Sequence, residues 1–168
     1  MKVINLKEEG IKRVASRSKY VVRWLDMDET EALSFDDYDD MRTAYHSNWC
    51  CEACGTQYEE GSQGLHCSHY FGRRAYAVRF DPMNAFAHCF GCHQKLGSNP
   101  DDFQRWAEAH LGEQAIGILR EKRENIGLAK DYKKNLKDVA KHYREQFALI
   151  QAARAEGNDG RIEFIGYI

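Results

Sequence analysis

The clearest pattern of apolar and polar positions lies in the C-terminal third of the chain. Between residues 128 and 155, apolar side chains recur at intervals of three and four residues, with polar residues between them. This spacing places them on one face and predicts a single long amphipathic helix. The members of this apolar stripe are Tyr132, Leu136, Val139, Tyr143, Phe147 and Ile150. The stripe needs a partner, which is either the glycine-interrupted middle segment at 49–98 or a second copy of the chain in a homodimer.

Two shorter helices are predicted before the long one. Residues 99–102 read Asn-Pro-Asp-Asp, which supplies a capping side chain, a proline for the first helical position and acids for the first turn. The helix that begins there is expected to end at Gly112. A second helix is expected over 113–125, with Ile116 and Leu119 facing inward.

The remaining elements are predicted from shorter patterns. Residues 3–6 and 19–25 are rich in apolar, β-branched or aromatic side chains and predict short strands. A serine-capped helix with acids in its first turn is expected over 34–45. A Gly-Asn-Asp-Gly sequence at 157–160 ends the long helix, and a final strand is expected over 161–168.

The middle of the chain differs from both ends. Glycines interrupt residues 49–98 at short intervals, which favours hairpins and knuckles over helices. The predicted fold class is therefore α+β. Around this module we expect an N-terminal strand and helix segment at 1–48, a helical extension at 99–157 and a C-terminal strand segment at 158–168.

The charge balance restricts how this protein could bind nucleic acid. The 168 residues include 24 lysines and arginines against 26 aspartates and glutamates, for a formal net charge of -2. Bulk positive charge therefore cannot hold nucleic acid, and any contact with DNA must be local. Basic residues do cluster, at 12–23, at 73–79 and along 130–144.

The sequence predicts a cytoplasmic location. No stretch approaches the roughly 18 apolar residues of a membrane span, and the N-terminus lacks the apolar segment of a signal peptide. Thiols stay reduced in the cytoplasm, so the six cysteines favour metal binding over disulfides.

Four of the cysteines form two Cys-x-x-Cys pairs, Cys51 with Cys54 and Cys89 with Cys92. Each pair can present two thiolates to one ion, so the four predict a single tetrahedral, structural Zn²⁺. Cys50 is an alternative to Cys51 as a ligand, and Cys67 is expected to be an unliganded thiol.

Other polar side chains lie inside the loop that this zinc would close. They are His66, His69, Asn84 and, directly after the last cysteine, His93. A zinc knuckle alone has no use for them, which predicts a second site with different chemistry. Hydrolysis of a phosphodiester needs a deprotonated water and a cation that neutralises charge on the phosphate. One histidine near its neutral pKa can take the proton, and another can hold the cation.

Residues 49–97 resemble the HNH endonucleases, the ββα-metal family, through a histidine, a mid-segment asparagine and a Cys-x-x-Cys-His ending. The resemblance implies a zinc-clamped ββα-metal core. In that core His69 is the general base, Asn84 orients it or supports its loop, and His93 holds a catalytic divalent ion, Mg²⁺ or Mn²⁺. The alternative for His93 is a zinc ligand that replaces a cysteine.

The sequence departs from the commonest family pattern at Ser68, where the family carries Asp or His as another metal ligand. Neutral serine is a weak ligand. We expect His66 to take this role, with Asp81 as the lesser candidate.

Three arginines lie beside the proposed base, Arg73, Arg74 and Arg79. Guanidinium groups bind phosphate through two parallel hydrogen bonds, so all three are candidates for DNA contact and Arg73 for catalysis. The alternative is plain solvation for Arg73 and a structural ion pair, for example with Asp81, for Arg79.

A narrower similarity concerns substrate. The block His66-x-x-His69-Tyr70, with Arg79-Phe80-x-x-x-Asn84, is similar to phage recombination nucleases of the NinG/Rap type, which act on branched DNA. This similarity implies a role in DNA recombination in the cytoplasm of a host cell.

The expected function is therefore a metal-dependent DNA endonuclease that hydrolyses phosphodiester bonds. One alternative is a non-catalytic, zinc-stabilised module that binds nucleic acid. Another is a zinc-dependent adaptor that assembles through the long C-terminal helix.

Overall fold

The computed structural model describes residues 4–5, 31–32, 43–159, 161–163 and 165–167. The chain divides into two compact units, residues 1–42 and 43–168.

In the first unit the described residues form one antiparallel pair of strands, β1 (Ile4–Asn5) with β2 (Glu31–Ala32). β1 lies within the strand predicted at 3–6. The strand predicted at 19–25 lies outside the described residues, as does most of the helix predicted at 34–45. The described end of that helix, residues 43–46, is helical and belongs to the second unit.

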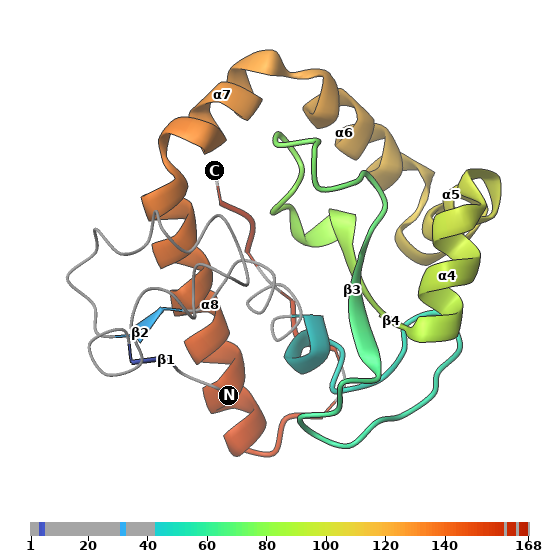
Figure 1. Cartoon of the computed structure of the whole chain (residues 1–168), viewed down its shortest axis with the longest axis vertical. Helices are drawn as coiled ribbons and strands as arrows, with labels where there is room; N and C mark the ends of the chain where they lie inside the picture. The colour runs from blue at the N-terminus through green and yellow to red at the C-terminus, as the bar shows by residue number, and fades with distance from the viewer. Residues whose placement is uncertain (1–3, 6–30, 33–42, 160, 164, 168) are drawn as a thin grey trace. The chain divides into compact units, whose positions relative to one another are not determined.

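A β-hairpin followed by a short helix lies at the centre of the second unit (Figure 1). β3 (Leu65–His69) pairs antiparallel with β4 (Ala85–Cys89), so that His69 lies opposite Ala85 and Leu65 lies opposite Cys89. α4 (Phe90–Ser98) begins directly after β4. This order, with helices in the rest of the unit, confirms the α+β class.

Four helices follow α4, namely α5 (Pro100–Leu111), α6 (Glu113–Glu124), α7 (Ile126–Lys134) and α8 (Leu136–Ala155). α5 begins as the sequence predicts, because the Asn99 side chain accepts a hydrogen bond from the Asp102 amide at 3.3 Å. Gly112 separates α5 from α6 at φ 91°, a conformation that favours glycine. The two predicted helices are therefore confirmed.

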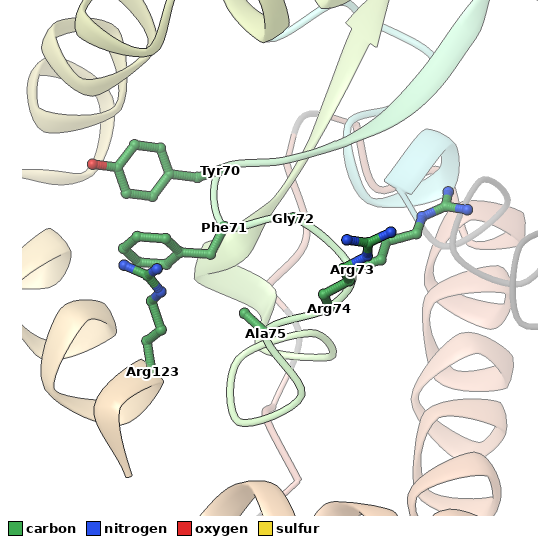
Figure 2. Close-up of a pocket in the computed structure, with 7 residues that line it drawn as sticks. All are labelled: Tyr70, Phe71, Gly72, Arg73, Arg74, Ala75 and Arg123. Atoms are coloured by element: carbon green, nitrogen blue, oxygen red, sulfur yellow. The ribbon is translucent and has the colours of Figure 1, made fainter. Parts of the chain in front are cut away.

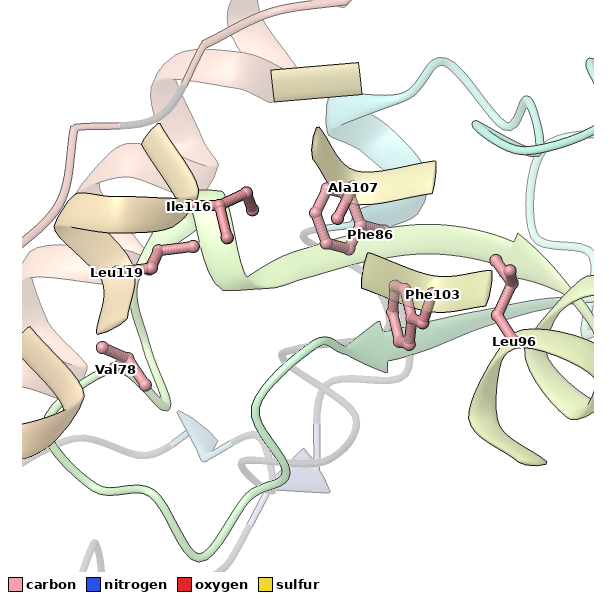
Figure 3. Packing of buried hydrophobic residues seen from close by; sticks show 7 residues of the cluster. All are labelled: Val78, Phe86, Leu96, Phe103, Ala107, Ile116 and Leu119. Carbon is pink, nitrogen blue, oxygen red and sulfur yellow. The ribbon is translucent and has the colours of Figure 1, made fainter. Parts of the chain in front are cut away.

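The core lies between β4 and the helices α4, α5 and α6 (Figure 3). Phe86 points from β4 into this cluster and is fully buried. Burial of each such side chain contributes about 1.5–3 kcal/mol. The cluster consists of Val78, Phe86, Leu96, Phe103, Ala107, Ile116 and Leu119. Its packing fixes one face of the hairpin against α4 and α5.

The prediction of one continuous helix over 128–155 is wrong, because two helices occupy this region. Asn135 leaves the helical conformation at φ -104° and ψ 29°, and it ends α7 and precedes α8. The apolar stripe nevertheless has helical spacing on both sides of the break, and all six of its residues are buried. The spacing alone therefore could not reveal the break.

The apolar stripe packs against the chain's own central module. Phe80 lies 6.1 Å from Tyr132 and 6.3 Å from Tyr143 between ring centres, and Phe147 lies 5.3 Å from Tyr45. The Tyr143 hydroxyl also donates a hydrogen bond to the Phe80 carbonyl. Phe80 belongs to the segment 49–98 that the sequence offered as a partner, and Tyr45 lies just before it. The homodimer stays a prediction.

The final strand predicted at 161–168 is not formed by its described residues, 161–163 and 165–167. Their backbone groups bond to helical partners instead of to a strand. The Ile162 amide donates to the His46 carbonyl at 3.1 Å, and the Tyr167 amide donates to the Tyr143 hydroxyl at 3.2 Å.

His46 makes the stability of this unit depend on pH. Its side chain is 3% exposed, and burial, reinforced by the positive charge of Arg161, lowers its pKa from 6.5 to about 4. The unfolded chain binds the proton more tightly, so this contribution is complete above pH 6.5 and is lost as the pH falls toward 4. A shift of this size corresponds to about 3 kcal/mol.

We expect the free energy of unfolding in urea to fall on acidification from about pH 6.5 to 4.5, and to fall less in His46→Gln. Both proteins keep the same cysteines, so the difference between their pH profiles isolates His46. Parallel profiles would contradict this assignment.

Candidate metal centre and histidine site

The four cysteines of the two Cys-x-x-Cys pairs come together in space. The Sγ atoms of Cys51, Cys54, Cys89 and Cys92 all lie within 4.8 Å of one another, and those of Cys54 and Cys89 are 3.9 Å apart. A tetrahedral zinc with Zn–S bonds of about 2.3 Å holds its sulfurs roughly 3.8 Å apart. The cluster is therefore arranged for one Zn²⁺, and neither Cys50 nor His93 belongs to it.

Local backbone geometry builds each half of this cluster. In the first half, Gly55 adopts φ 72° and its amide donates to the Cys51 carbonyl at 2.8 Å, which closes the turn. In the second half, Cys89 is the last residue of β4 and Cys92 lies in the first turn of α4. The Cys89 amide donates to the Cys51 sulfur at 3.3 Å, which joins the halves.

The thiols differ in how easily they lose a proton. The side chain and backbone of Thr56 hydrogen-bond to the exposed sulfur of Cys54 and lower its pKa to about 6. Burial raises the pKa of Cys51. Cys54 is therefore the thiolate most accessible to an incoming metal at neutral pH.

Glu52 attaches the first cysteine pair to the hairpin, and the sequence did not indicate this role. Its amide donates to the Ala87 carbonyl at 2.8 Å, and its carboxylate accepts from the Ala87 amide at 2.6 Å. The same carboxylate lies 3.0 Å from Arg161 and 3.5 Å from His110. Burial acts to raise the pKa of Glu52, but its partners, led by His110, lower it.

Two of the histidines singled out by the sequence are neighbours. The ring centres of His66 on β3 and His93 on α4 are 5.7 Å apart. Burial lowers the pKa of His93, and the positive charges of His66 and Arg73 lower it further. His93 is therefore neutral at neutral pH and can offer a nitrogen lone pair to a cation.

His69 lies on the other face of the hairpin. Side chains alternate along β3, so His66 and Ser68 share one face, and Cys67 and His69 share the opposite face. The Cys67 sulfur lies 3.9 Å from His69 Nδ1, in agreement with this alternation. Among the described residues β3 pairs with β4 alone, so its other edge is unpaired. A group placed at this unpaired edge lies beside both faces of the strand.

Asn84 holds the loop that follows His69. Its side chain is fully buried, accepts a hydrogen bond from the Phe71 amide at 2.7 Å and donates one to the Phe71 carbonyl at 3.0 Å. The Tyr70 amide also donates to the Asn84 carbonyl at 3.1 Å. Asn84 therefore fixes the backbone directly after His69.

The three arginines have different environments. Arg73 and Arg74 are exposed on the loop that Asn84 holds. Arg79 is 2% exposed and its guanidinium lies 5.2 Å from the ring centre of Phe80. It is part of a turn and not of the strand expected around it, and its side chain is buried within the fold.

Asp81 is occupied by structural contacts. One carboxylate oxygen accepts the Met83 amide at 3.0 Å and the other lies 2.7 Å from Lys122 of α6. These contacts leave His66 as the better candidate for the second metal ligand. They also show that the acid considered as a partner for Arg79 pairs with a lysine instead.

Comparison with protein-family models, curated proteins and solved structures finds no significant match to this chain. Among the described residues, no helix has the length and apolar character needed to cross a bilayer.

We expect Cys51→Ser to lose most of its zinc, because three thiolates remain and metal binding is coupled to folding of this segment. Zinc content per chain after purification, together with the thermal unfolding midpoint, measures the effect. Cys50→Ser is the matched control and should keep one zinc per chain. Equal loss in both variants would contradict the four-sulfur site.

We expect Asn84→Ala to lower the free energy of unfolding by about 1–3 kcal/mol, because the half-buried amide and carbonyl of Phe71 lose the partner that the buried Asn84 side chain supplies. Urea unfolding of the zinc-loaded protein measures this. A change below about 0.5 kcal/mol would mean that the loop is held by other contacts.

Proposed function

We propose that this protein is a zinc-stabilised, metal-dependent DNA endonuclease. The observation that carries the proposal is the approach of His66 and His93, from β3 and α4, at 5.7 Å between ring centres. The strand that carries His66 ends in His69 and runs into a loop with two exposed arginines. One cation ligand, the proposed base and two phosphate-binding groups thus occur along one short segment, and the second cation ligand comes from α4.

The spacing of the two histidines fits a shared cation. With metal–nitrogen bonds of about 2.1 Å, two imidazoles on one ion have ring centres roughly 4.5–6.5 Å apart, depending on their angle. The observed 5.7 Å lies inside this range. His66 and His93 would hold Mg²⁺ or Mn²⁺, which supplies positive charge for the phosphate and the leaving oxygen.

His69 is proposed as the general base. An imidazole with a near-neutral pKa can take a proton from the attacking water. Because His69 and His66 project from opposite faces of β3, the scissile phosphate would have to lie at the unpaired edge of that strand. Asn84 would keep the base in position through its hold on the adjacent loop.

Arg73 and Arg74 are proposed to bind the DNA phosphates. Both are exposed on the loop after His69, and the positive charge of Arg73 contributes to lowering the pKa of His93. A guanidinium in this place would stabilise the negative charge that develops on the cleaved strand. The chain's net charge of -2 makes such a local contact necessary.

The main alternative is a zinc-stabilised module that binds nucleic acid without cutting it. The observation that favours it is the placement of His66 and His69 on opposite faces of β3. Only cleavage at the strand edge reconciles that placement with catalysis, so an activity assay separates the two functions.

We expect the purified zinc-loaded protein to nick plasmid DNA with Mg²⁺ or Mn²⁺, and His69→Ala to cut at least about 100-fold more slowly, because it lacks the base. Zinc content and the thermal midpoint should be unchanged. His142→Ala, a histidine outside the site, should cut normally. Binding without cutting by the wild type across metals would establish the alternative.

Branched recombination intermediates are the proposed substrates within this function, on the basis of the resemblance of the His66-x-x-His69-Tyr70 segment to phage recombination nucleases. A panel of branched and linear duplexes in the same assay compares these substrates directly.

A further inference from the structure

The loop after β3 lines a cavity of about 520 Å³. This volume falls within the range of about 300–1,000 Å³ that is usual for ligand sites. The lining contains two aromatic residues, three arginines and no acid: Tyr70, Phe71, Gly72, Arg73, Arg74, Ala75 and Arg123 (Figure 2). Such a lining suits an anion that also carries a flat ring.

The two kinds of side chain extend from different flanks of the loop. Figure 2 shows the Phe71 ring beside the guanidinium of Arg123 from α6, with Tyr70 on the same side of the loop, whereas Arg73 and Arg74 extend to the opposite side, beyond Gly72. A ligand laid across the loop would therefore meet a stacking surface on one flank and positive charge on the other.

Phe71 is placed to stack on a planar group. The Arg123 guanidinium lies 4.8 Å from the centre of the Phe71 ring, so a planar cation already uses this face. The side chain of Arg123 is 51% exposed, and its ion-pair partner Glu124 is 3.8 Å away and 76% exposed. Exposed ion pairs and exposed contacts between a cation and an aromatic ring are both weak. A nucleobase could therefore displace Arg123 from the Phe71 ring or stack alongside it.

The ring is also rigidly positioned. Both backbone groups of Phe71 bond to the buried side chain of Asn84, and the Tyr70 ring lies 4.6 Å from the Phe71 ring. A preorganised aromatic platform loses little entropy when a base stacks on it.

We propose that this cavity binds an unpaired nucleotide of single-stranded DNA, with its base stacked at Phe71 and Arg123 and its flanking phosphates at Arg73 and Arg74. The inference rests on the proposed nuclease function for its substrate class. Bases in a continuous duplex are stacked on one another and expose no ring face, whereas single strands bind to aromatic platforms within basic grooves. DNA with an unpaired nucleotide beside the cut is thus the preferred substrate.

The test compares binding of a fluorescein-labelled single-stranded DNA 20-mer with binding of its duplex and of the RNA of the same sequence. Fluorescence anisotropy is measured on zinc-loaded protein without added Mg²⁺ or Mn²⁺, so that nothing is cut. Single-stranded DNA should bind at least about 5-fold more tightly than duplex, as expected for one stacked base. Equal or tighter binding of duplex or of RNA would overturn the proposal.

Variants of Phe71 test whether the nucleobase stacks on this ring. Phe71→Leu should weaken binding of the single strand at least about 5-fold and change duplex binding less than about 2-fold, whereas Phe71→Trp should retain affinity. A 2-aminopurine in the strand should be quenched by wild type and Phe71→Trp, but not by Phe71→Leu. Unchanged affinity and quenching in folded Phe71→Leu would overturn the proposal.

The variant Arg74→Gln tests whether Arg74 contacts a DNA phosphate. It should weaken binding and reduce the dependence of log Kd on log salt concentration by about 0.7, while Lys141→Gln, on the exposed side of α8, should do neither. An unchanged salt dependence in Arg74→Gln would remove Arg74 from the site. If the wild type binds the single strand in a Phe71-dependent manner but cuts no DNA with any metal, the nuclease function is refuted and the nucleotide site still stands.

Discussion

The approach of four cysteine sulfurs within 4.8 Å is the interaction on which the rest of the central module depends. A two-stranded hairpin is at best marginally stable by itself. Here the turn at Cys51 and Cys54 is joined to the end of β4 and the start of α4, and a metal at this point would hold strand and helix at a fixed angle. Glu52 adds a second link through the backbone of Ala87.

That arrangement governs the histidines. Because α4 starts at the metal cluster and packs beside one face of the hairpin, His93 meets His66. Strand alternation then places His69 on the other face, at the end of β3. Any shared chemistry must take place at the strand's open edge, beside the loop that Asn84 fixes. The proposed nucleotide site lies on that same loop. One rigid segment would then both orient the general base, His69, and bind the DNA strand.

Local features of the chain could be predicted from the sequence because their causes lie within a few residues. The spacing of each Cys-x-x-Cys pair limits which sulfurs can share an ion, and the Asn-Pro-Asp-Asp sequence caps α5 with its own side chain. Apolar spacing likewise identified every buried residue of the stripe. The cysteine cluster, the hairpin module and the helices after it are therefore encoded in short segments.

Tertiary packing decided what depends on residues far apart in the chain. Asp81 pairs with Lys122 and Arg79 is buried beside Phe80, and the sequence indicated neither of these contacts. Arg123 reaches the loop from α6, and no local pattern announces such a contact. The sequence by itself determined which four cysteines cluster and which helical positions are buried, because cysteine spacing and apolar periodicity are local. The partners of the charged side chains were settled only by the fold, because a buried or paired charge depends on whichever distant element packs against it.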